Sequence, residues 1–115
     1  MTILDLFRSR QKPDLDQSVL SQLQKVGSDL SKPHSIEFFL YFPAQSVAEN
    51  AATLIRAAGF EVDVRRAAQG DTWLCLATKT MVPKLADLQK IRHTFVDLAA
   101  SLNGEYDGWG TPVVK

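Results

Sequence analysis

Apolar and polar residues alternate along several short stretches of the chain, and this period of two is typical of half-buried strands. Between Ser35 and Phe42 every second residue from Ile36 onward is apolar, so one face of that stretch is continuously apolar. Residues 60–66 and 72–81 alternate in a similar way. The pattern therefore predicts three strands, and the stretch after residue 103 predicts a fourth.

Between these strands, apolar residues recur every three or four positions, which indicates amphipathic helices. Helices are predicted from Asp14 to Val26, from Val47 to Ala58 and from Pro83 to Leu102, each followed closely by a glycine. The element order is one helix and then β-α-β-β-α-β. This order predicts an α+β fold of the ferredoxin-like kind, a four-stranded antiparallel sheet with two helices on one face, preceded by an extra N-terminal helix. The strands at 35–42 and 72–81 are expected to be adjacent and central.

The sheet face opposite the two helices is expected to carry Phe39 and Tyr41, with Trp73 as a further candidate. Large apolar side chains on a sheet surface need a cover. Either the N-terminal helix packs over this face, or a partner molecule does.

The length, net charge and cysteine content of the chain limit the classes of protein and of partner that fit it. A chain of 115 residues fits one domain, assigned to residues 14–115 with residues 1–13 as an N-terminal arm. Thirteen basic and thirteen acidic residues leave a net charge of zero, so no overall field attracts nucleic acid or a membrane surface. The single cysteine, Cys75, excludes an internal disulfide framework. A cytoplasmic protein without a membrane segment is expected.

Candidate catalytic groups are sparse. His93 and Asp97 share a helix face, but neither His93 nor His34 has further ligands at the spacing of a zinc site. Cys75 lies in an apolar strand, where an inert buried thiol is the default. No phosphate-binding loop or nucleophile elbow is present, so we expect no enzyme activity, no cofactor and no metal.

The most distinctive stretch is Gly104–Thr111, in which two aromatic residues, two carboxylates and three glycines fall within eight positions. We expect a positive φ at Gly108, because glycine reaches that conformation without steric cost. We also expect the side chain of Trp109 to be anchored in a pocket. The candidate signature or contact positions are Glu105, Tyr106, Asp107, Gly108, Trp109 and Gly110.

This motif, together with the aromatic strand 34–42 and the helix end Ala58-Gly59-Phe60-Glu61-Val62, resembles the RraB-like family of regulators of ribonuclease E. The resemblance implies a ferredoxin-like, noncatalytic bacterial protein. It also implies inhibition of the ribonuclease by binding the noncatalytic region of that enzyme, rather than by competing for RNA. The best-known members are strongly acidic and so have an electrostatic route to this basic region, whereas the present chain is neutral.

Two alternatives remain open beside a ribonuclease regulator. The first is an RNA-binding module that stacks bases on Phe39 and Tyr41, as RNA recognition motifs do with the same element order. The third strand lacks the basic and aromatic pattern of such motifs, so RNA binding is the less favoured interpretation. The second is a family relative with a different protein partner. The sequence does not fix the oligomeric state.

Overall fold

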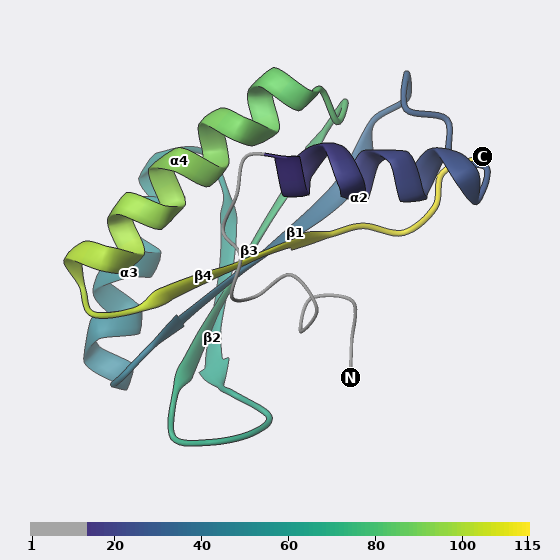
Figure 1. Ribbon diagram of the computed structural model, residues 1–115. Helices are drawn as coiled ribbons and strands as arrows, with labels where there is room; N and C mark the ends of the chain where they lie inside the picture. The colour runs from purple at the N-terminus through teal and green to yellow at the C-terminus, as the bar shows by residue number, and fades with distance from the viewer. Residues whose placement is uncertain (1–13) are drawn as a thin grey trace.

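The computed structural model describes residues 14–115, and the predicted arm at residues 1–13 lies outside this part (Figure 1). The order of elements is the one predicted. The elements are α2 (Asp14–Lys25), β1 (His34–Phe42), α3 (Gln45–Ala57), β2 (Glu61–Arg66), β3 (Trp73–Met81), α4 (Leu85–Ser101) and β4 (Glu105–Gly110).

The four strands form one antiparallel sheet in the order β2-β3-β1-β4. β1 and β3 are paired along their full length, from His34 opposite Met81 to Phe42 opposite Trp73. The predicted central pair and the ferredoxin-like α+β arrangement are thus confirmed. The alternation in β1 fits this arrangement, because it places one continuously apolar face against the helices.

The core lies between the sheet and its helices. The β1 side chains of Ile36, Phe38, Leu40 and Phe42 are fully buried. α3 packs mainly over β2 and β3, and its buried small residues Ala48, Ala51 and Ala52 allow the helix backbone to approach the sheet closely. The thiol of Cys75 on β3 donates to the carbonyl oxygen of Ala48 at 3.1 Å, which shows how close this approach is.

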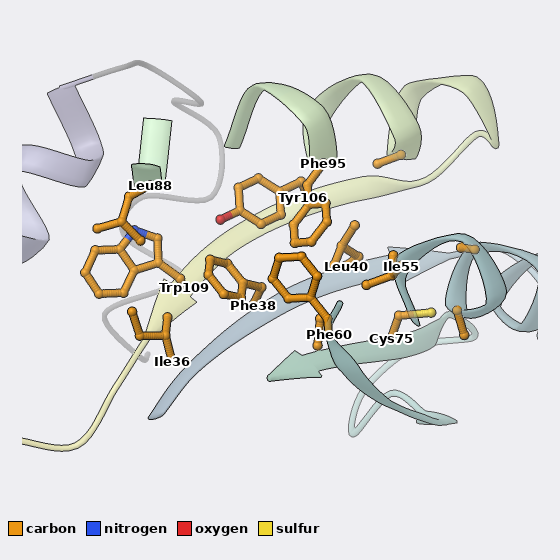
Figure 2. Close-up of a cluster of buried hydrophobic side chains, with 14 of the residues drawn as sticks. Ile36, Phe38, Leu40, Ile55, Phe60, Cys75, Leu88, Phe95, Tyr106 and Trp109 are labelled. Atoms are coloured by element: carbon orange, nitrogen blue, oxygen red, sulfur yellow. The ribbon is translucent and has the colours of Figure 1, made fainter. Parts of the chain in front are cut away.

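Aromatic rings fill the other half of the core, beneath α4 (Figure 2). Phe95 of α4 is the hub, with ring centroids 5.6 Å from Phe38, 5.1 Å from Phe60 and 5.8 Å from Tyr106. Edge-to-face and tilted contacts of this kind add to the stabilisation from area burial alone. One cluster therefore holds together β1, α4, β4 and the residue that precedes β2.

One expected arrangement placed the N-terminal helix over the sheet face that carries Phe39 and Tyr41, and the position of α2 differs from it. α2 does not cover the second sheet face; it lies in the helical layer beside α4, and its residues Leu20 and Leu23 belong to the common core (Figure 1). On that side α2 also contributes the buried Asp16, whose contacts are described below.

Candidate functional site

The signature strand β4 contains a bulge, and the bulge explains the unusual composition of this strand. Trp109 lies opposite Phe38 and Tyr106 lies opposite Leu40, so β4 uses one more residue than β1 over the same length. The φ of Gly108 is positive, as predicted, and measures 100°. The extra residue turns both Tyr106 and Trp109 toward the helices, where each is only 3% exposed.

Trp109 is anchored as predicted, and its partner is a carboxylate on α2. Figure 2 shows the indole at the end of the row of buried side chains, next to Leu88. The indole Nε1 donates to Asp16 Oδ1 at 3.0 Å. Arg92 of α4 donates through Nε to the other oxygen, Oδ2, at 3.2 Å. One buried carboxylate therefore joins α2, α4 and β4.

The electrostatics of this anchor are dominated by the cost of burial. Desolvation raises the pKa of Asp16 above its ordinary value, and the hydrogen bond from Trp109 and the charge of Arg92 lower it in part. Burial likewise raises the pKa of the Tyr106 hydroxyl, and the nearby Asp16 carboxylate raises it further. Burial therefore favours the protonated form of both groups, and the two donors to Asp16 oppose this effect in part.

The six candidate signature positions therefore divide into two groups. Tyr106, Asp107 and Trp109 are buried. Glu105 is exposed, and Gly108 and Gly110 are partly exposed. The two aromatic residues belong to the core, and Glu105 is the one of the six positions that is classed as exposed.

A second buried polar cluster was not anticipated from the sequence. His34, with no exposed surface, lies 2.7 Å through Nε2 from the hydroxyl of Ser28, and its Nδ1 lies 2.8 Å from the carbonyl of Lys32. The Ser28 hydroxyl also accepts the backbone N–H of Val114 at 3.0 Å. A serine beside a histidine is the arrangement of a nucleophile and its base. Here both are buried and the serine oxygen is occupied, so the cluster fastens the C-terminal residues to the loop before β1.

The sheet face opposite the helices is defined by the strand register, because directly opposed residues share a face. Three rows cross it. The first row runs across β2, β3 and β1 through Asp63, Leu76 and Phe39. The second row continues to β4 and contains Arg65, Leu74, Tyr41 and Glu105. The third row contains Glu61, Thr78, Glu37 and Gly110. Within residues 14–115 no helix covers these rows, and we call them the helix-free face.

Phe39 and Tyr41 lie on the helix-free face as predicted, both partly exposed, and Leu74 and Leu76 of β3 extend their apolar strip. Trp73 does not join them. It is paired with the buried Phe42 and packs against the core beneath the helices, so its placement as a candidate on this face was wrong. The reason is register: Trp73 lies one residue before Leu74 and therefore points to the opposite side.

Charge is unevenly distributed in this neutral chain. The helix-free face carries four carboxylates, from Glu37, Glu61, Asp63 and Glu105, against one guanidinium. That guanidinium, Arg65, lies 2.8 Å from Asp63 and is thereby partly neutralised. Although the net charge of the chain is zero, the helix-free face therefore has an apolar strip surrounded by acidic side chains.

The described residues contain little that could support catalysis or metal binding. No group of three or more His, Cys, Asp or Glu side chains in residues 14–115 is arranged to hold a metal ion. His93 and Asp97 are 3.5 Å apart on an exposed face of α4. Burial raises the pKa of the Cys75 thiol to about 11, so this group remains protonated at neutral pH.

Comparison with known proteins assigns the family. The family model described as "Regulator of ribonuclease activity B" matches residues 14–111, which is most of the chain. The chain belongs to the RraB family. A relative named "Regulator of ribonuclease activity B", from Pseudoalteromonas atlantica, is 33% identical over 106 residues, which cover 89% of this chain and 91% of the relative.

Membership of a family of ribonuclease regulators points to a noncatalytic protein. The matched range begins with α2 and ends at Thr111, so it includes both Asp16 and Trp109. None of the helices within residues 14–115 has the length and apolar content needed to cross a bilayer.

Proposed function

We propose that this RraB-family protein regulates a ribonuclease in the cytoplasm by binding the enzyme as a protein, with no chemical step of its own. The target in this proposal is ribonuclease E, through the basic, noncatalytic part of that enzyme. The family match supports regulation of a ribonuclease in general. The choice of surface and of target rests on the composition of the helix-free face.

The proposal rests on one observation: the helix-free face combines an apolar strip with an acidic rim. The strip of Phe39, Tyr41, Leu74 and Leu76 provides area that a partner can bury, and the four carboxylates around it complement a basic segment. Arginine side chains suit such a surface, because a guanidinium stacks on an aromatic ring while it pairs with a carboxylate. An arginine-rich protein segment is the partner that uses both properties.

The same face is poorly suited to RNA. Phe39 and Tyr41 on β1 would allow base stacking, which is the one feature that favours an RNA-binding module. The third strand contributes Leu74 and Leu76 instead of further aromatic residues, and the surrounding carboxylates repel phosphates. Protein binding is therefore the better use of this surface.

The test measures binding and inhibition together. Purified ribonuclease E, with and without its noncatalytic region, is titrated with the protein while cleavage of an RNA substrate is followed. We expect saturable binding and slower cleavage only when the noncatalytic region is present. Tyr41→Ala and Glu37→Lys should each weaken binding about tenfold or more, as expected for an aromatic anchor and for a reversed charge at an interface.

Matched controls separate an effect of the helix-free face from a general effect of charge. Glu49→Lys makes the same reversal on the exposed side of α3 and should leave binding unchanged. Equal weakening by Glu49→Lys and Glu37→Lys would contradict the assignment of the surface. Tight binding to single-stranded RNA that survives moderate salt and is lost in Tyr41→Ala would instead establish the RNA-binding module.

A further inference from the structure

The helical side of the molecule contains a cavity that the proposed ribonuclease contact does not use. It has a volume of about 430 Å³, within the range of small-ligand sites, and it opens between the end of α3, the end of β3 and one face of α4. Ala58, Phe60, Met81, Ile91 and Phe95 supply its apolar lining.

Phe60 and Phe95 form a preformed floor. Their rings are 5.1 Å apart and both are part of the aromatic cluster of the core (Figure 2). A ligand entering the cavity would therefore contact a rigid apolar surface, and little ordering of the protein would be needed for binding.

Charged groups line the mouth of this cavity, and they are mostly cationic. Lys79 lies on the helical side of β3, because it is paired with the buried Ile36, and its ammonium is 4.9 Å from the centre of the Phe60 ring. Lys90 reaches the cavity from α4, one turn after Asp87, which also lines it. Neither lysine forms an ion pair with any residue from 14 to 115.

We propose that this cavity binds a small anionic amphiphile, a monocarboxylate with an unbranched or aromatic apolar body. The apolar body lies on Phe60 and Phe95, and the carboxylate is held between the ammonium groups of Lys79 and Lys90. One feature selects this class over a neutral apolar molecule or a cation: two lysines, Lys79 on β3 and Lys90 on α4, line the same apolar cavity. Asp87 opposes binding of the anion and limits its affinity.

The test is titration of the full-length, ¹⁵N-labelled protein with octanoate, below its micelle concentration, followed by amide chemical shifts. Saturable shifts are expected at Phe60, Met81 and Ile91, with octanol and octylammonium binding more weakly. Lys79→Gln and Lys90→Gln should each weaken octanoate binding about two- to tenfold, the range of partly exposed charge-assisted contacts.

Two further variants make the test specific to this cavity. Asp87→Asn removes the opposing charge and should strengthen octanoate binding by a few-fold, a change that a damaged fold would not produce. Lys84→Gln removes an exposed cation just before α4 that is outside the cavity lining, and it should have no effect.

Several outcomes would overturn the proposal. Equal affinity for octanoate and octanol would show an apolar cavity without selection of an anion. Shifts that do not saturate, or that fall elsewhere, would show no site. Displacement of octanoate by a short acidic peptide at much lower concentration would assign the cavity to a protein segment. No ribonuclease is present in these measurements, so their outcome is independent of the proposed regulation.

Discussion

At the scale of single residues, Asp16 is the group on which the arrangement of this protein depends most clearly. Its carboxylate is buried, and its two oxygens accept hydrogen bonds from Trp109 and Arg92, which come from different elements. A buried charge with incomplete compensation is costly, so its contribution to stability should vary with pH.

The first prediction concerns this pH dependence. Because burial raises the pKa of Asp16 above 3.8, the folded state binds its proton more tightly than the unfolded state does. The stabilisation from this proton is full below the unfolded pKa and is lost as pH rises through the raised folded pKa. A tenfold difference in proton affinity between the two states corresponds to about 1.4 kcal/mol of stability.

The measurement compares the parent with Asp16→Asn by urea denaturation from pH 3 to pH 7. The free energy of unfolding of the parent minus that of the variant should be largest at the acid end. It should fall as pH rises above about 3.8, the ordinary value, and then become constant. A difference that increases with pH would mean that Trp109 and Arg92 outweigh the cost of burial.

At the scale of elements, the bulge in β4 shows how one residue can redirect a strand. Without the extra residue at Gly108, Tyr106 and Trp109 would lie on opposite sides of the sheet, because they are three positions apart. Gly104, just before β4, has a different role: a Cβ there would lie 2.5 Å from Tyr41 O and from the Phe42 ring. Two glycines of one motif are thus required for different reasons, one for its φ angle and one for space.

The second prediction follows from these two roles. Gly108→Ala should lower the free energy of unfolding by about 1 to 3 kcal/mol because of strain at positive φ, and Gly108→Val should lower it more. Gly110→Ala is the matched control and should be nearly neutral, since within residues 14–115 only the adjoining residues come within 4 Å of a Cβ at this position. Denaturant midpoints that are the same for all three variants would argue against the bulge.

At the scale of the whole molecule, segregation of charge matters more than its sum. Acidic groups surround the helix-free face, whereas Lys79 and Lys90 line the cavity on the helical side. A neutral molecule arranged in this way can attract a basic protein segment on one side without attracting it on the other.

The third prediction is the salt dependence that this arrangement implies. Binding to the noncatalytic region of ribonuclease E should weaken as salt rises from about 50 to about 300 mM, although the protein has no net charge. Glu37→Lys and Glu105→Lys should flatten the plot of log affinity against log salt, and Glu49→Lys should not. An affinity that does not depend on salt would show that the carboxylates of the helix-free face do not contribute.

The sequence by itself determined the order of elements, the central pair of strands, the positive φ of Gly108 and the placement of Phe39 and Tyr41. These properties follow from local spacing, because the alternation along a strand fixes which residues share a face. Only the tertiary structure decided that Asp16, 93 positions away, is the partner of Trp109, and that Ser28 and His34 hold Val114. It also decided the side on which α2 packs and the gathering of carboxylates on one face of a neutral chain. Contacts between distant residues depend on how whole elements pack against one another, and that packing has no local period from which it could be predicted.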